Sequence, residues 1–478
     1  MLRHAPVAYN ETSMADSPQS GTDTIAAIST PPGRGGIGIV RLSGPDSTAI
    51  AAQLVRLRQP LEHGRARLAN VLDNLADAEP GDTAEAGRID EAVVTYFAAP
   101  NSYTTEELVE IAAHGSPVVL DLLLRRAISL GARLAEPGEF SQRAFLAGRI
   151  DLTQAEAVRD LIEAQTLTQA RQAASQMGGA LSRRVVPIKQ GLVDLIALLE
   201  AGIDFAEDDV DVTSETEIAR RVDQLTPPLA ALEASFARGR IVHDGLTLAI
   251  VGRPNAGKSS LFNRLVERER AIVTASPGTT RDTVTERISL DGIPLELVDT
   301  AGLREAHDVA EQLGIARSRE ALADADLVLI VLDATQPLND EERELLAAVQ
   351  DRPSVVAVNK SDLNPEAGAE HEFIAIPSIP TSALTGEGIA DLRSRILALA
   401  SGGAASEPGM LTSMRHHQAV STALTALADA ARANAAAIPH EMILLDLYRA
   451  LWALDSLTGQ TTSDDILNLI FSTFCIGK

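Results

Sequence analysis

The chain has 478 residues, 45% of them hydrophobic and 22% charged, and this length favours two to four domains of about 100 to 200 residues each. It contains no apolar run near the roughly 20 residues of a membrane-spanning helix, and its single cysteine, Cys475, excludes an intramolecular disulfide. The single cysteine and the lack of a long apolar run lead us to expect a cytoplasmic protein with no membrane contact. The net charge of −25 disfavours a protein that binds nucleic acid mainly by neutralising phosphates.

The N-terminal part of the chain predicts a tail followed by an α+β domain. Residues 1–23 are expected to form a disordered tail, in which Met14 is a second candidate start. In residues 24–140, Gly and Pro separate short apolar runs, such as 37–42 and 92–97, that are typical of strands. This pattern predicts an N-terminal α+β domain.

Three glycines in this part satisfy the pattern GxGxxG. Gly33, Gly35 and Gly38 precede the strand expected at 39–42, whereas a dinucleotide-binding loop follows a strand and opens a helix. We therefore expect no dinucleotide site here.

Two separate stretches predict one helical domain, residues 141–240 and 395–478. Apolar residues recur at helical spacing in both, and the second begins near a Gly/Ala/Ser linker at 401–406. Breaks are expected near Pro439 and Gly459. The acidic residues 204–211 are interpreted as a solvated loop, with a metal site as the alternative.

Residues 241–394 predict an inserted α/β domain. Short, nearly continuous apolar runs lie at 246–251, 295–298, 327–332 and 355–358, and Gly-rich turns or helical patterns separate them. Such runs suit the buried strands of a mostly parallel sheet. We expect a Ras-like P-loop G domain inserted between the two helical stretches.

The first nucleotide motif is GRPNAGKS at residues 252–259. Its glycines let backbone N–H groups surround phosphates, Lys258 reaches the β and γ oxygens, and the Ser259 hydroxyl coordinates Mg²⁺. Asp299 to Gly302 (DTAG) follow another apolar run, where a magnesium-side aspartate and a γ-phosphate-sensing glycine belong. Together the two motifs predict a GTP- or ATP-hydrolysing site.

Two further motifs select guanine. Asn359, Lys360 and Asp362 match the NKxD motif, whose aspartate accepts hydrogen bonds from the base. Ser382, Ala383 and Leu384 resemble the fifth GTPase motif, which supplies a backbone amide behind the base. We therefore expect GTP as the nucleotide.

The residue that positions the attacking water is left open by the motifs. Leu303 occupies the place of the Ras glutamine and cannot orient water. The polar candidates that follow are Arg304, Glu305, His307, Asp308 and Glu311. Thr280 is the expected switch threonine on Mg²⁺. Asn255 is a candidate neighbour of a monovalent cation, with a simple turn residue as the alternative.

The whole chain beyond about residue 20 resembles the MnmE (TrmE) family of bacterial tRNA-modification GTPases, within the TrmE-Era-EngA-like P-loop GTPases. The segments that carry the resemblance are 30–36, 99–104, 137–141, 149–156, 299–305 and 475–478. The resemblance implies a potassium-stimulated GTPase in which Glu311 orients the water, Ser259 and Thr280 hold Mg²⁺, and K⁺ has its own ligands. Those ligands would be Asn255, Thr274, Ser276 and Thr279.

The expected nucleotide-binding residues come from the motifs and the resemblance together. They are Asn255, Ala256, Gly257, Lys258, Ser259, Ser260, Thr274, Ala275, Ser276, Pro277, Gly278, Thr279, Thr280, Asp299, Thr300, Ala301, Gly302, Asn359, Lys360, Asp362, Ser382, Ala383 and Leu384. Lys258 and Glu311 are the expected catalytic residues.

The resemblance also implies a folate site in a dimer-forming N-terminal domain. Its expected residues are Arg41, Glu110, Arg149 and Lys478. Arg149 stands where lysine is common in the family, which keeps the charge and alters the geometry. Cys475 fits a prenylation signal poorly because Gly477 and a final lysine follow it, and the resemblance implies a functional tail thiol.

The resemblance implies a reaction on tRNA. An FAD-containing partner of the MnmG type would form a heterotetramer with the homodimer and contact much of the tRNA. The complex would add an aminomethyl or carboxymethylaminomethyl group to C5 of the wobble uridine, with 5-formyl- or methylene-tetrahydrofolate as the one-carbon source. The alternatives are a ribosome-assembly GTPase of the Era or Der type, which would need an RNA-binding module, and a regulatory GTPase switch without modification chemistry.

Overall fold

The computed structural model describes residues 23–72, 87–204, 214–267, 284–299, 325–364, 376–401, 407–460 and 464–477. It separates into two compact units, one of Met1–Ala155 with Thr462–Lys478 and one of Glu156–Thr461. Residues 1–22 of the tail expected at 1–23, residues 402–406 of the linker expected at 401–406, and most of the acidic stretch 204–211 lie outside the described residues. No helix among the described residues has the length and apolar content to cross a bilayer.

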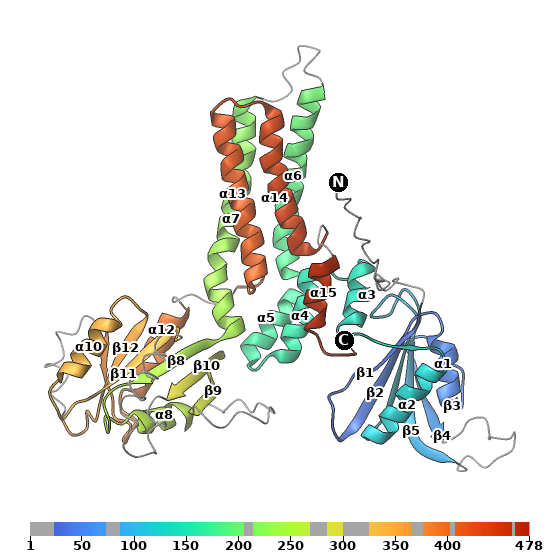
Figure 1. The fold of residues 1–478 in the computed structure, drawn as a ribbon, viewed down its shortest axis with the longest axis horizontal. Helices are drawn as coiled ribbons and strands as arrows, with labels where there is room; N and C mark the ends of the chain where they lie inside the picture. The colour runs from blue at the N-terminus through green and yellow to red at the C-terminus, as the bar shows by residue number, and fades with distance from the viewer. Residues whose placement is uncertain are drawn as a thin grey trace, which may run out of the picture. The chain divides into compact units, whose positions relative to one another are not determined.

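The first unit is built on a seven-stranded sheet in the order β3-β4-β5-β6-β2-β1-β7 (Figure 1). All its neighbouring strands are antiparallel except β1 and β7. The strands are β1 (Ile25–Ile28), β2 (Gly35–Ser43), β3 (Val55–Leu57), β4 (Ala66–Leu72), β5 (Arg88–Phe97), β6 (Leu108–Gly115) and β7 (Arg133–Leu134). The strands expected at 37–42 and 92–97 are confirmed as parts of β2 and β5.

The two faces of this sheet carry different cores. On one face, Ala26 and neighbouring strand residues pack with α1 (Ser47–Leu54) and α2 (Pro117–Ser129). On the other face, Ile25 and Ala27 pack with Phe140 of α3 (Glu139–Leu146). The alternation along β1 follows from the two-residue period of a strand. The remaining helix of this unit is α15 (Asp464–Ser472).

The position of the GxGxxG glycines differs from the expectation in one respect. They follow a strand, because β1 ends at Ile28, but Gly35 and Gly38 lie inside β2 instead of opening a helix. A Cβ atom at Gly38 would lie 2.4 Å from Leu120 of α2, so this glycine allows the helix to approach the strand. The segment is a strand-packing feature and not a dinucleotide-binding loop.

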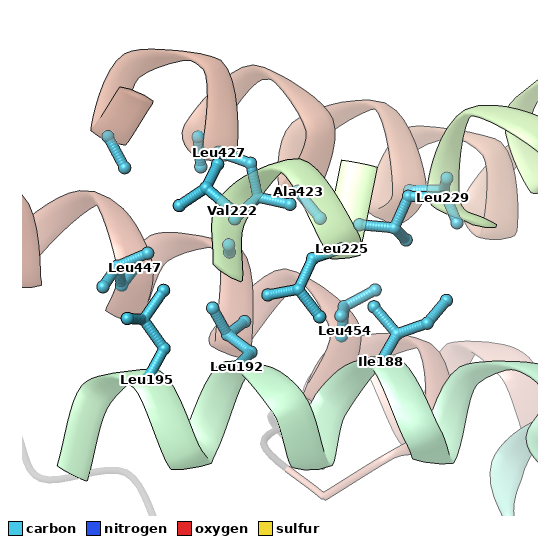
Figure 2. Packing of buried hydrophobic residues seen from close by; sticks show 14 of the residues in the cluster. Ile188, Leu192, Leu195, Val222, Leu225, Leu229, Ala423, Leu427, Leu447 and Leu454 are labelled. Atoms are coloured by element: carbon cyan, nitrogen blue, oxygen red, sulfur yellow. The ribbon is translucent and has the colours of Figure 1, made fainter. Parts of the chain in front are cut away.

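The long helices of the second unit pack together as a bundle (Figure 1). They are α6 (Ala180–Asp204), α7 (Glu215–Asp244), α13 (Met414–Ala435) and α14 (His440–Thr458), with α4 (Leu152–Glu163) and α5 (Leu167–Met177) preceding them in the chain. Leu192 and Leu195 of α6 face Leu225 of α7 and Leu447 of α14 across a continuous apolar core (Figure 2). The expected breaks are confirmed, because α14 begins after Pro439 and ends at Gly459.

A second sheet is inserted between α7 and α13. Its order is β13-β12-β11-β8-β10-β9, parallel throughout except for β9. The strands are β8 (Leu246–Val251), β9 (Val284–Leu290), β10 (Ile293–Asp299), β11 (Leu327–Asp333), β12 (Ser354–Asn359) and β13 (Ser378–Pro380), and the helices are α8 (Lys258–Glu267), α10 (Asp340–Ala348) and α12 (Ile389–Ser401). The expected inserted domain with a mostly parallel sheet is confirmed.

Glu156 joins α4 to the ends of two bundle helices. Its carboxylate accepts hydrogen bonds from Arg415 Nε at 2.8 Å and from His416 Nε2 at 2.7 Å. Arg415 also donates to the carbonyl oxygens of Ser456 and Leu457 at the end of α14. Burial alone would raise the pKa of Glu156, but the charge of His416 and the hydrogen bonds from both partners outweigh it and lower the pKa to about 2.

We predict that Glu156→Gln destabilises the helical part of the chain at neutral pH. The pKa of this carboxyl group is lower folded than unfolded, so its contribution is complete above the ordinary value of 4.5 and is lost as the pH falls toward about 2. The shift corresponds to about 3 kcal/mol. Urea unfolding followed by circular dichroism at pH 7 and pH 3 should show a loss at pH 7 that shrinks at pH 3.

Glu217→Gln provides a matched control. Glu217 bonds to Arg220 and Arg221 on α7, and these bonds lower its pKa to about 2, but the group is exposed to solvent. Exposed ion pairs contribute little to stability. Equal losses from the two substitutions would contradict the importance assigned to the buried cluster.

Candidate nucleotide-binding site

The predicted nucleotide motifs lie at the carboxyl edge of the second sheet. β8 ends at Val251 and leads into the loop 252–257, after which α8 begins at Lys258. Asp333 and Asn359, the last residues of β11 and β12, are register partners, and Asp299 at the end of β10 pairs with Ile250 of β8. Ligands bind at this edge in open α/β sheets because the strands deliver their loops to one place.

The phosphate-binding loop depends on backbone conformations that favour glycine. The φ angles of Gly252 and Gly257 are +147° and +94°, and Asn255 adopts +63°. A Cβ atom at Gly257 would lie 2.1 Å from Asn359 Nδ2, and one at Gly252 would lie 2.3 Å from the Val331 carbonyl oxygen. Both glycines therefore permit a close approach that no other residue allows.

Lys258 is buried against its own loop. Its Nζ donates hydrogen bonds to the carbonyl oxygens of Gly252 and Arg253, each at 2.8 Å. Ser259 and Ser260 lie beside it in the first turn of α8 and are exposed. The helix N-terminus and the lysine together place positive charge at the loop, which suits a bound phosphate.

Asn359 connects the phosphate loop to the base-binding segments. Its side chain is 2% exposed. Nδ2 donates to the Ala256 carbonyl at 2.9 Å, and Oδ1 accepts from the Ala383 N–H at 3.0 Å. One buried amide thus holds the loop after β8 and the loop after β13 at fixed positions. We call these two hydrogen bonds the Asn359 clamp.

The loop after β13 is folded by its own hydrogen bonds. Ser382 Oγ accepts from the Thr385 N–H at 3.1 Å, and the Leu384 carbonyl oxygen accepts from Arg264 Nη2 at 3.1 Å. The Leu384 side chain is 81% exposed. Because the Ala383 N–H donates to Asn359, the Asn359 clamp fixes the position of this loop without a bound base.

Sequence reasoning missed Asp333. Its carboxylate accepts from Lys360 Nζ at 2.7 Å and from the Thr335 hydroxyl at 2.6 Å. Burial opposes its ionisation, but these bonds outweigh the burial and keep the pKa of Asp333 below its ordinary value. The sequence signal that could have found Asp333 is a polar residue directly after the apolar run 327–332. Asn359 stands at the equivalent position, directly after the apolar run 355–358.

Many of the predicted nucleotide and metal residues lie outside the described residues. These are Thr274, Ala275, Ser276, Pro277, Gly278, Thr279, Thr280, Thr300, Ala301, Gly302 and Glu311, together with Leu303, Arg304, Glu305, His307 and Asp308. The structure brings together the remaining members, from Asn255 to Ser260 in the first loop and from Asn359 to Leu384 at the base-binding end. Asp362 is half-buried in the turn that follows β12.

The residues expected to bind folate gather in the first unit around two aromatic rings. Arg41 donates to Glu110 Oε1 from Nε at 3.0 Å and Nη2 at 2.7 Å, and it lies over the rings of Tyr103 and Phe140. The Arg149 guanidinium also lies over Tyr103, 5.7 Å from the ring centre. Three of the four predicted residues therefore share one location.

The C-terminal tail reaches the same location. Arg41 Nη1 donates to the Gly477 carbonyl oxygen at 3.2 Å, and Ile476 pairs with Pro137 in an isolated antiparallel bridge. Cys475 is a free, exposed thiol beside this bridge. Lys478 lies outside the described residues.

Comparison with known proteins gives two family models that together cover most of the chain. Residues 24–149 match the model described as GTP-binding protein TrmE N-terminus, and residues 152–475 match the MnmE helical domain. The chain is similar to the tRNA modification GTPase MnmE of Koribacter versatilis, with 58% identity over 95% of this chain and 99% of that protein. It is 43% identical to the protein of the same name from Nitrosomonas europaea, again over 95% and 99%.

A similarity to solved structures covers a smaller part. The G domain of the T. maritima FeoB iron transporter is 27% identical and matches 32% of this chain and 98% of its own, with a TM-score of 0.25. That score is too low to support an inference, so the relation rests on the family models and the sequence relatives.

We predict that Gly257→Ala lowers the affinity for guanine nucleotides about 100-fold. A positive φ costs a residue with a Cβ about 1 to 2 kcal/mol, and the clash would displace the buried Asn359 amide, whose lost bonds cost about 1 to 3 kcal/mol each. Titration with a fluorescent GDP analogue measures the change. Gly131→Ala, at φ +107° with no atom near its Cβ, should leave the affinity unchanged. Binding by Gly257→Ala within threefold of the unsubstituted chain would contradict the role of the clamp.

Proposed function

The chain belongs to the MnmE family of tRNA modification GTPases, and from this premise we propose the finer reaction that it carries out. It is a potassium-stimulated GTPase that works with an MnmG-type flavoprotein. Together they add an aminomethyl or carboxymethylaminomethyl group to C5 of the wobble uridine of certain tRNAs. Tetrahydrofolate supplies the one-carbon unit, FAD resides on the partner, and the reaction takes place in the cytoplasm.

The observation that carries the GTPase part of the proposal is the Asn359 clamp. It fixes the phosphate loop, through Ala256, at a set distance from the base-binding loop, through Ala383. A nucleotide has its phosphates and its base at opposite ends, so a site that holds both must hold these loops together. Asp362 follows in the same turn and would accept hydrogen bonds from guanine, because guanine presents N–H donors where adenine does not.

The donor atoms available for ions fit hard cations. Asn255 and Ser259, the two described members of the proposed ion sites, carry an amide oxygen and a hydroxyl on exposed side chains at the loop. Such oxygen ligands suit Mg²⁺ and K⁺. Ser259 and Thr280 would hold Mg²⁺, and Asn255, Thr274, Ser276 and Thr279 would hold K⁺. When bound, these ions neutralise charge on the phosphates, while Glu311 would orient the water.

The cluster around Arg41 supports the folate part. A pterin is flat and rich in hydrogen-bonding groups, and its glutamate tail is negatively charged. Arg41 and Glu110 offer charges of both signs beside the Tyr103 ring, and Arg149 adds a second cation. These residues, with Lys478, would hold the ring and the carboxylates. The N-terminal domain that carries them would also form the homodimer.

The charge of the chain favours a division of the tRNA contact. With 41 basic and 66 acidic residues, the chain carries a net charge of −25, which repels phosphates. A heterotetramer with the flavoprotein would let the partner hold much of the tRNA. This chain would then contribute the nucleotide-driven step and the folate.

We predict that deletion of the gene removes 5-aminomethyl-type wobble uridines from cellular tRNA. Mass spectrometry of tRNA nucleosides measures the loss. Complementation with the unsubstituted gene should restore them, whereas Glu311→Ala should not, because the attacking water would lack its orienting carboxylate. Intact wobble uridines in the deletion strain would reject the modification reaction while leaving GTP hydrolysis in place.

We predict that Arg41→Gln weakens binding of 5-formyltetrahydrofolate to the full chain at least about tenfold. Hydrogen bonds to charged groups contribute about 1.5 to 3 kcal/mol, and the substitution removes one such donor. Isothermal titration calorimetry provides the measurement. Arg125→Gln, which removes an exposed arginine of α2 paired with Asp121, serves as the control. Absence of stoichiometric folate binding by the unsubstituted chain would overturn the folate assignment.

A further inference from the structure

Asp333 is a buried carboxylate whose two oxygens contact different partners. Oδ1 accepts from the N–H and the hydroxyl of Thr335 at 2.9 and 2.6 Å, and Oδ2 faces Lys360 Nζ at 2.7 Å. Its side chain is 3% exposed. Thr335 therefore fixes the orientation of the carboxylate, and that orientation determines where the ammonium group of Lys360 lies.

Lys360 is held both at its backbone and at its ammonium group. Its backbone adopts φ +68°, a left-handed conformation that is uncommon for residues other than glycine. Its carbonyl oxygen accepts from the Leu363 N–H at 3.0 Å, and the next residue, Ser361, donates to the Thr381 carbonyl at 3.1 Å. The backbone is thus tied to the turn after β12 and to the base-binding loop, while the tip is tied to β11.

The fixed lysine has a consequence for Asp362, which lies two residues further along. Within the described residues, Asp362 forms no ion pair, whereas Lys360 is paired with Asp333. A free ammonium group on a flexible four-carbon chain would be attracted to carboxylates that remain accessible nearby. Asp362 is partly exposed two residues further along the chain, and a lysine bound to it would compete with the N–H groups of a base.

We propose that Asp333 is a positioning residue for guanine nucleotides, which holds the Lys360 ammonium group away from Asp362 and so keeps that carboxylate available to the base. The inference rests on the proposed guanine-reading role of Asp362. It assigns the residue a function in selectivity, exerted through Lys360 and without contact with the nucleotide. A buried carboxylate that served stability alone would have no effect on which base is bound.

The test uses GDP and inosine diphosphate, which differ by the 2-amino group of the base. This amino group is one of the donors that a carboxylate at Asp362 would accept, so the ratio of the two affinities reports on the carboxylate. Asp333→Asn keeps an oxygen for Thr335 and loses the charge that attracts Lys360. Calorimetric titration of the full chain should show GDP affinity lowered about tenfold and the GDP preference reduced several-fold.

A double substitution identifies the route of the effect. In the Lys360→Met background no ammonium group can compete for Asp362, so adding Asp333→Asn should leave the ratio of GDP to inosine diphosphate affinity unchanged. An equal reduction of the ratio in both backgrounds would overturn the inference. So would a loss of affinity for both nucleotides by the same factor, since that is the result expected from a purely structural role.

Two further variants keep the test decisive. If Asp333→Asn does not fold, Thr335→Val takes its place, because it removes the hydroxyl that orients the carboxylate and should reduce the ratio in the same direction by a smaller factor. An unchanged ratio in folded Thr335→Val would then overturn the inference. Asp351→Asn removes one exposed carboxylate from the same domain and should leave the ratio unchanged.

Asp362→Asn separates this inference from the proposed function. An amide can donate to a carbonyl at C2, so this variant should lose GDP and gain affinity for xanthosine diphosphate. If it keeps the guanine preference of the unsubstituted chain, the guanine-reading role fails regardless of Asp333. If the preference changes and Asp333→Asn leaves the ratio unaltered, only the role of Asp333 is overturned.

Discussion

The buried amide of Asn359 is the interaction on which the arrangement of the nucleotide-binding site depends. A buried amide that lacks partners destabilises a protein, so its donor and acceptor must be satisfied inside the fold. Asn359 finds one partner in the phosphate loop and the other in the loop after β13. The absence of a Cβ at Gly257 leaves room for that amide. The loop predicted to bind phosphate and the loop predicted to lie behind the base are thereby held together at the edge of the sheet.

The strands and bundle helices could be predicted because their signals are local. The apolar runs at 246–251 and 327–332 are strands because buried parallel strands require apolar side chains on both faces. The pairing of Asp333 with Lys360 could not be predicted in the same way, since Asp333 ends β11, Lys360 follows β12, and the two residues meet only because these strands are neighbours in the sheet. The clamp between Asn359 and Ala383 was hidden for the same reason. Motifs locate functional residues, and topology determines what supports them.

Arg41 shows the limit of a resemblance. The family pattern places Arg41, Glu110 and Arg149 in a common site, but neither composition nor spacing predicts that Tyr103 and Phe140 lie beneath the guanidinium groups. The contact of Arg41 with Gly477 joins positions 436 residues apart in the sequence. Only the packing of the C-terminal tail onto the first unit makes that pair. The chemistry of the cluster is therefore a property of the folded unit.

Asp333 and Glu156 illustrate two uses of a buried carboxylate. Each is ionised because charged partners outweigh the effect of burial. Glu156 draws its partners from α13 alone and, through Arg415, holds the end of α14, so its charge connects helices. Asp333 pairs with Lys360 of the predicted guanine-reading motif, so its charge fixes the position of a lysine side chain. The Asn359 clamp joins the loop after β8 to the loop after β13, and the Asp333 pair joins the end of β11 to Lys360. Under the proposed function, the response to the γ-phosphate would fall to Thr280 and Gly302, which the sequence predicts as switch residues and which lie outside the described residues.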